Sequence, residues 1–169
     1  MDLETLYRLE FPWVHATVRR LGVSSGDIED AVHDIFVKIH EKLEDYDEQR
    51  PRRPWLYAFV LRHVVDYRRR AKHRRMEPDV LAAVPIDDSP SPEERTDMAE
   101  RRGLLELALA DVPPHRRDVI VMCKLDDLST GDVARLLGVS EDTVSSRLRQ
   151  GLENLQTALR RLQRPGTKQ

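Results

Sequence analysis

The sequence has one cysteine, few aromatic residues and no long apolar run, and each scarcity excludes a class of protein. The single cysteine, Cys123, excludes an internal disulfide, fits a reducing compartment, and lies in the apolar run 119–123, where we expect it in the core. No apolar stretch approaches the roughly 20 residues that a membrane-spanning helix needs. The acidic, amphipathic start MDLETLYRLE does not resemble a secretory signal, so we expect a cytoplasmic protein.

The sequence also shows no recognisable arrangement of catalytic residues. The six histidines are scattered along the chain, and it has no glycine-rich loop of the kind that binds phosphate. We therefore expect no enzymatic activity, no cofactor, no resident metal and no small-molecule substrate. A metal-dependent hydrolase would need convergent ligands, and stoichiometric bound metal would be the finding that favours it.

What the sequence does contain is helical periodicity and charge. Apolar residues make up 40% of the 169 residues, charged residues 34%, and the β-branched residues recur at helical spacing, which predicts an all-α fold. The net charge of −2 is unevenly distributed. Residues 1–76 carry 15 Lys/Arg and 13 Asp/Glu, residues 77–98 carry 1 and 7, and residues 99–169 carry 12 and 10. The middle segment is also proline-rich and aperiodic. We therefore predict two small helical domains, 1–76 and 99–169, joined by an acidic linker.

The stretch 129–150, STGDVARLLGVSEDTVSSRLRQ, predicts a helix-turn-helix. Ser129 caps the first helix, Gly138 supplies the positive φ of the turn, and Ser140 caps the second helix. Val144, Leu148, Leu152 and Leu155 are the predicted buried stripe of that second helix. Its opposite face mixes small hydroxyls with arginines, which suits a helix in a DNA major groove. The candidate DNA-binding residues are Ser140, Glu141, Asp142, Thr143, Ser145, Ser146, Arg147 and Arg149. A plain pair of capped helices is the simpler alternative.

In the first half, periodicity predicts helices over 2–21 and from Ser24 or Ser25 to Leu43. The second of these has a polar face around Asp30, His33, Asp34 and Lys38. That face has three interpretations: a solvated surface, a metal site using Asp30, His33, Asp34 and His40, or a docking surface for a basic partner. The rest of the sequence favours docking.

A third helix, 55–67, is apolar over most of its circumference, and Val65 is expected to widen its buried side. Its polar stripe predicts ion pairs of Asp66 with Arg62 and Arg70. The helix leads into the basic run 68–75, RRRAKHRR, whose charge would act on phosphates. In the second half, a helix starts near Ala99, and Pro113-Pro114 begins the next one.

Together these segments resemble a sigma factor of the sigma-70 family, in the extracytoplasmic-function (group 4) class. DIEDAVHDIFVKIHEKLEDYD and RPWLYAFVLRHVVDYRRR resemble the family's region 2. LADVPPHRRDVIVMCKLDDLSTGDVARLLGVSEDTVSSRLRQGLENLQ resembles its region 4. One departure is His33, which stands where the family usually has glutamine.

The resemblance implies a subunit that binds core RNA polymerase and promoter DNA and is inhibited by an anti-sigma factor. Asp30, His33, Asp34 and Lys38 would dock on the clamp helices of the polymerase β′ subunit. Region 4 would read the −35 element and meet the β flap, and the acidic linker would thread toward the RNA path. The residues implied for the −10 element are Arg62, His63, Asp66, Arg69, Arg70, Lys72 and Arg74.

Two other functions compete with this interpretation. A stand-alone helix-turn-helix regulator would bind duplex promoter tightly without polymerase, but it leaves the first half of the chain unexplained. A helical adaptor or anti-sigma protein would bind no DNA in any context.

Overall fold

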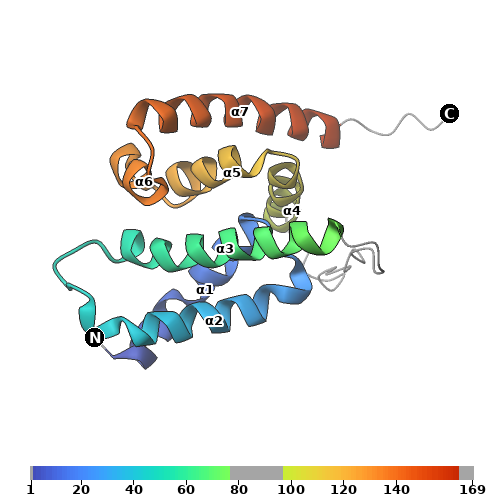
Figure 1. Ribbon diagram of the computed structural model, residues 1–169. Helices are drawn as coiled ribbons and strands as arrows, with labels where there is room; N and C mark the ends of the chain where they lie inside the picture. The colour runs from blue at the N-terminus through green and yellow to red at the C-terminus, as the bar shows by residue number, and fades with distance from the viewer. Residues whose placement is uncertain (1, 77–96, 164–169) are drawn as a thin grey trace. The chain divides into compact units, whose positions relative to one another are not determined.

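The computed structural model describes residues 2–76 and 97–163, and within these ranges every regular element is helical. This confirms the predicted all-α fold. The helices form two compact units, with α1–α3 in the first and α4–α7 in the second (Figure 1). The predicted linker lies outside the described residues as far as residue 96. Residues 97 and 98, predicted as its end, instead begin α4.

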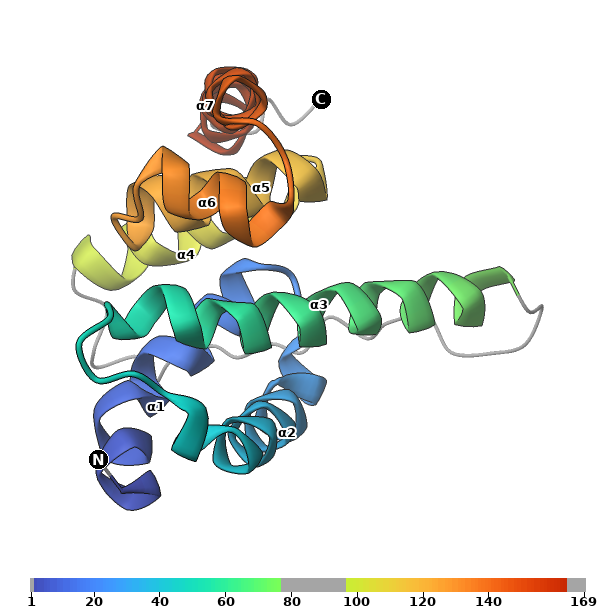
Figure 2. The same ribbon diagram turned by 60° about the vertical axis from the view of Figure 1, so that its left-hand side comes forward.

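The first unit is a three-helix arrangement in which α2 packs on both α1 and α3 (Figure 2). The helices are α1 (Leu3–Arg20), α2 (Ile28–Glu41) and α3 (Arg52–Met76), with 3-10 turns η1 (Ser25–Asp27) and η2 (Leu43–Asp45) flanking α2. The apolar residues that recur at helical spacing in this segment are buried, namely Ile28, Ala31, Val32, Ile35, Phe36 and Ile39. Leu43, which continues the same spacing, is half-buried in η2. Asp2 caps α1 by accepting a hydrogen bond from the Thr5 amide at 2.8 Å.

The basic half of α3 is held against the turn between α1 and α2. Gly22 occupies this turn with φ of +93°, which L side chains rarely adopt. The Tyr67 hydroxyl donates to the Asp27 carboxylate at 2.7 Å and accepts from the Ser24 amide at 3.3 Å. One residue further, the Arg68 guanidinium donates to the Leu21 carbonyl. These bonds fix the direction in which the following basic residues project.

The structure corrects the sequence prediction for α3 at three points. The helix begins at Arg52, three residues before the predicted start at residue 55, and Arg52 pairs with the buried Glu10 at 2.9 Å. Val65, predicted to widen the buried side, is 54% exposed. Asp66 pairs with Arg69 at 3.1 Å, a spacing of three residues, in place of the predicted four-residue pairs. The polar side of α3 is therefore broader than the sequence indicated.

The second unit contains α4 (Asp97–Ala110), α5 (Pro114–Ile120), a π-helical turn η3 (Val121–Leu125), α6 (Thr130–Leu137) and α7 (Glu141–Gln163). Pro113 and Pro114 begin α5, as predicted. The π-helical turn was not predicted. Cys123 lies in it half-buried, more exposed than a core residue, and burial raises the pKa of its thiol.

The predicted helix-turn-helix is confirmed in its local chemistry. Ser129 accepts from the Asp132 amide at 3.1 Å at the start of α6, and Gly138 ends α6 with φ of +65°. Ser140 accepts from the Thr143 amide at 3.2 Å at the start of α7. Two side-chain caps and one left-handed residue thus define where both helices begin and how they are joined.

The buried stripe of α7 differs from the prediction. Val144, Gly151 and Ala158 are buried, whereas Leu152, predicted to be buried, is 37% exposed. A Cβ on Gly151 would lie 2.9 Å from Cδ1 of Ile120 and 3.2 Å from Cβ of Arg116. Helix α7 therefore crosses α5 at a point where only a hydrogen fits.

Candidate functional site

The candidate DNA-reading surface is the first half of α7. Of the predicted residues, Asp142, Ser145 and Arg149 are exposed, and Ser146 and Arg147 are half-buried. Arg149 lies 3.6 Å from Glu153, an exposed pair that contributes little and would readily exchange for a phosphate. The structure thus presents two guanidinium groups and two small hydroxyls on one stretch of helix, the donors that recognise guanine edges and backbone phosphates.

Three of the predicted reading residues also hold the α7 N-terminus in place. Ser140 and Thr143 form the cap, with their hydroxyl oxygens 2.9 Å apart. The Glu141 carboxylate accepts from the Thr130 hydroxyl of α6 at 3.0 Å. A Cβ on Gly131 would lie 3.4 Å from the same carboxylate, an ordinary van der Waals contact, so the bond from Thr130 to Glu141 does not require glycine at this position. These contacts set the angle between the two helices of the motif.

The candidate docking surface on α2 is exposed as predicted, and it includes an apolar residue that sequence reasoning missed. Asp30, His33, Asp34 and Lys38 are all exposed. Val37 lies among them and is 42% exposed. Lys38 donates to the Glu41 carboxylate at 3.0 Å. A single exposed apolar side chain is common on protein surfaces, so Val37 adds an apolar contact to this face without by itself marking an interface. The sequence could have indicated this residue, because Val37 places an apolar side chain among the polar positions of α2.

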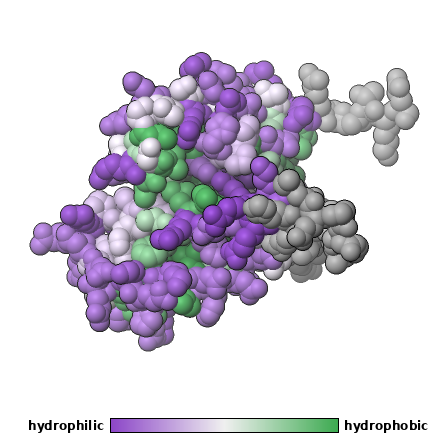
Figure 3. Space-filling model, viewed as in Figure 1, coloured by the Kyte–Doolittle hydropathy of each residue, from purple (hydrophilic) through white to green (hydrophobic). Residues whose placement is uncertain are grey.

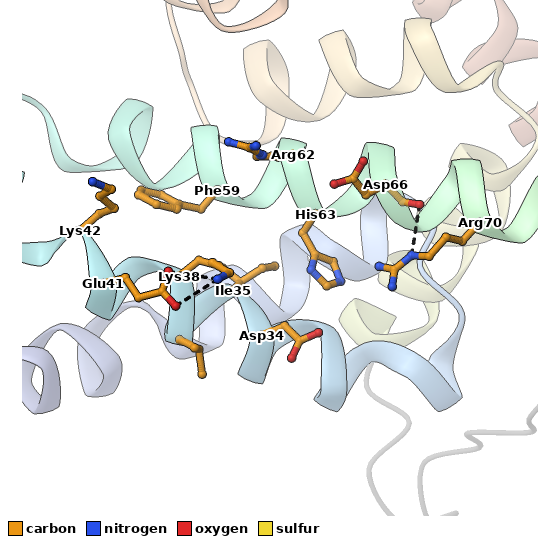
Figure 4. A pocket seen from close by; sticks show the side chains of 11 residues that line it. Asp34, Ile35, Lys38, Glu41, Lys42, Phe59, Arg62, His63, Asp66 and Arg70 are labelled. Atoms are coloured by element: carbon orange, nitrogen blue, oxygen red, sulfur yellow. Dashed lines mark hydrogen bonds and ion pairs between the residues drawn. The ribbon is translucent and has the colours of Figure 1, made fainter.

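The residues predicted to meet the −10 element fall into two groups around α3. His63, Asp66 and Arg70 line a hollow of about 660 Å³ between α3 and α2, and Arg62 lies at its rim (Figure 4). The opposite wall carries Asp34, Lys38 and Glu41 of α2, and His63 points toward Asp34 (Figure 4). Arg69 and Lys72 are exposed and take no part in the hollow. The side chain of Arg74 lies outside the described residues.

Electrostatics in this hollow act most clearly on His63. Partial burial is the main cause that lowers its pKa, and the Arg70 guanidinium lowers it further. The Asp34 and Asp66 carboxylates act in the opposite direction without reversing the shift. Near neutral pH the imidazole is therefore mostly uncharged, and it can both donate and accept a hydrogen bond.

We expect this shift to make the first unit less stable in mild acid. The unfolded chain binds a proton at His63 more readily than the folded one, so stability falls as pH drops below about 6.5, the usual histidine pKa, toward the lower folded value. The urea midpoint of unfolding, followed by tryptophan fluorescence, should fall between pH 7.5 and pH 5.5. This fall should be smaller in His63→Asn than in the wild type. The exposed His40 provides the control, since His40→Asn should retain the full decline. An equal decline in His63→Asn would contradict the assignment.

No three His, Cys, Asp or Glu side chains in residues 2–76 and 97–163 converge to hold a metal ion. No helix within the described parts of the chain is long and apolar enough to cross a membrane. Hydrophilic side chains cover much of the visible surface (Figure 3). The predicted site residues lie on three surfaces: the α7 face, the α2 face and the charged sides of α3.

Family comparisons cover the same two halves of the chain. The model of Sigma-70 region 2 matches residues 6–74, and that of Sigma-70, region 4 matches residues 102–155. Among similar proteins, the RNA polymerase sigma factor CnrH of Cupriavidus metallidurans is 30% identical over 139 residues, covering 77% of this chain and 72% of that protein. The ferric citrate uptake sigma factor FecI of Escherichia coli is 28% identical, covering 91% and 88%.

The length match is uneven among relatives. The ECF RNA polymerase sigma factor SigE of Mycolicibacterium smegmatis is 28% identical over 92% of this chain, which spans 61% of that protein. Among solved structures, the sigma factor RpoE of Bartonella quintana, crystallised with the anti-sigma factor NepR, aligns with a TM-score of 0.76 at 19% identity. That alignment covers 94% of this chain and 97% of the other, and at this identity it shows the shared fold.

Proposed function

Because this chain belongs to the sigma-70 family of RNA polymerase sigma factors, in the extracytoplasmic-function class, we propose that it is a promoter-specificity subunit. It binds core RNA polymerase, recognises the −10 and −35 promoter elements and helps to open the DNA. One observation supports this proposal most strongly: the chain combines two units. The region 2 unit has an exposed acidic helix face, and the region 4 unit has a capped helix-turn-helix.

The second unit would read the −35 element with α7. Arg147 and Arg149 supply donors that fit guanine N7 and O6 or phosphate oxygens, and Ser145 and Ser146 supply short hydroxyls. Glu141, Ser140 and Thr143 would act by holding this helix at its angle to α6. Region 4 would in addition contact the β flap of polymerase, as the family resemblance implies.

The first unit would join polymerase and open DNA. The α2 face around Asp34 and Val37 would dock on the β′ clamp helices, and the basic residues of α3 would hold the promoter backbone near the −10 element. Opening two strands requires no catalytic side chain, because contacts to unstacked bases offset the cost of unpairing them.

An anti-sigma factor is the partner that we propose for the inactive state. RpoE of Bartonella quintana was solved with the anti-sigma factor NepR, and CnrH with the cytosolic domain of CnrY. A similar partner on this chain would cover the α2 and α7 faces together and so block both polymerase and DNA. Without any partner, we expect the free chain to bind promoter weakly, and nanomolar affinity at physiological salt would contradict this.

Assembly with polymerase is the experiment that tests the function. The chain mixed with purified core polymerase should co-migrate with it in gel filtration, and the complex should shift promoter fragments that the chain alone does not shift. If the chain does not bind core but shifts the fragments alone, it is a stand-alone regulator.

A further inference from the structure

Helix α3 carries two rows of charged residues on different sides. One row, His63, Asp66 and Arg70, lies along the hollow between α3 and α2. The other, Arg69 and Lys72 beside the exposed Val65, lies outside that hollow. Adjacent residues of an α-helix project about 100° apart, because 3.6 residues complete a turn. Arg69 and Arg70 therefore face different surroundings although they are neighbours in the basic run.

The hollow is poorly suited to DNA. Its α2 wall carries the carboxylates of Asp34 and Glu41 among the cations, and both would repel a phosphate entering it. A polyanion is best bound by accessible cations. The outer row offers Lys72 and also Arg69, whose exposed pair with Asp66 at 3.1 Å would readily exchange for a phosphate. Alternating acids and bases instead suit a protein segment with complementary charges.

The hollow also adjoins the α2 face that we assign to polymerase docking. Asp34 and Lys38 belong to both surfaces, and His63 points from α3 toward Asp34 (Figure 4). A stable protein interface covers about 800 Å² and about 20 to 30 residues on each partner. Helix α2 has 14 residues in all. A partner seated on α2 must therefore extend to a neighbouring element, and the charged hollow is the adjoining surface that offers it specific contacts.

We propose that the inner row of α3, with Arg70 as its main cation, is part of the polymerase-docking surface, and that DNA contacts the outer row. This rests on the proposed function and revises the sequence prediction, which placed both rows at the −10 element. The occupant is a segment of core polymerase with basic residues toward Asp34 and Glu41 and an acidic residue toward Arg70.

The neighbouring arginines give a matched pair of variants in the full chain. Arg70→Glu should weaken binding to core polymerase, measured without DNA, by tenfold or more, and Arg70→Lys should restore most of it. Arg69→Glu should leave core affinity within about twofold of the wild type. With core saturating, Arg69→Glu should instead weaken promoter binding and reduce its salt dependence by about one counterion. Circular dichroism should show both variants folded, because both side chains are exposed.

Three results would overturn the proposal. These are unchanged core affinity in Arg70→Glu, equal loss of core affinity in both variants, or equal loss of promoter binding at saturating core. A wild-type chain that does not bind core would instead contradict the proposed function itself, and the two failures are thereby distinguished.

Discussion

Gly151→Leu should lower the free energy of unfolding of the second unit by about 1 to 3 kcal/mol, the usual cost of forcing extra carbon atoms into a packed contact. The Cβ alone would meet Ile120 Cδ1 at 2.9 Å and Arg116 Cβ at 3.2 Å. Helices α5 and α7 would have to separate, although α7 carries the reading surface. Hydrogen exchange measured on α5 and α7 peptides of the full chain should show faster exchange in the variant.

Two controls make this prediction specific. Gly103→Ala in α4 places a Cβ where no heavy atom lies within 4 Å, so it should stabilise the same unit by about 0.5 to 1 kcal/mol through helix propensity. Both tryptophans, Trp13 and Trp55, lie in the first unit, and its fluorescence-detected unfolding should not change. Unaltered exchange in Gly151→Leu would contradict the close packing of α5 on α7.

Loss of the two arginines on the reading surface should have the largest effect on promoter recognition. Each base or phosphate contact of this kind is worth about 1 to 3 kcal/mol, so the double change Arg147→Ala and Arg149→Ala should weaken promoter binding by the assembled polymerase about 100-fold or more. The measurement is titration of a promoter fragment with saturating core present. Arg160→Ala, an exposed arginine near the other end of α7, should bind as the wild type does.

The single variants distinguish base contacts from phosphate contacts. A base contact predicts lost preference at one base pair, whereas a phosphate contact predicts uniform weakening and a smaller dependence on salt. If neither Arg147→Ala nor Arg149→Ala alters promoter binding at saturating core, α7 is not the −35 reading helix.

Those parts of the fold that local chemistry decides could be predicted from the sequence. Ser129, Gly138 and Ser140 each act on the backbone within three or four residues, and all three perform the predicted role. Pro114 likewise begins α5 because its missing amide would have no partner in a first turn. The apolar stripe of α2 also followed directly from its helical period.

Other parts depend on contacts between distant segments, and sequence periodicity does not specify them. Leu152 fits the apolar period of α7 but is partly exposed, because the buried side of α7 runs through the smaller Gly151 and Ala158, with Gly151 against Ile120 of α5. Val65 is apolar and exposed because α1 and α2 cover a different side of α3. Hydrophobicity alone predicts burial for both residues, and tertiary packing decides otherwise.

The candidate site shows the same division. The exposure of the α2 face and of Arg149 could be read from periodicity. Periodicity could not show that His63 and Arg70 face α2, because a run of basic residues does not indicate which of its members meets a neighbouring helix. The bond from Thr130 to Glu141 joins two helices across a turn, and only their relative angle brings these side chains together.

Run-off transcription with purified core polymerase tests most directly whether this chain is a promoter-specificity subunit. Fragments from upstream of its own gene are suitable templates. We expect a defined transcript that requires both core polymerase and this chain, and that is lost when Arg147 and Arg149 are both changed to Ala. No transcript from any fragment, together with tight binding of those fragments by the chain alone, would contradict a sigma factor and identify a stand-alone DNA-binding regulator.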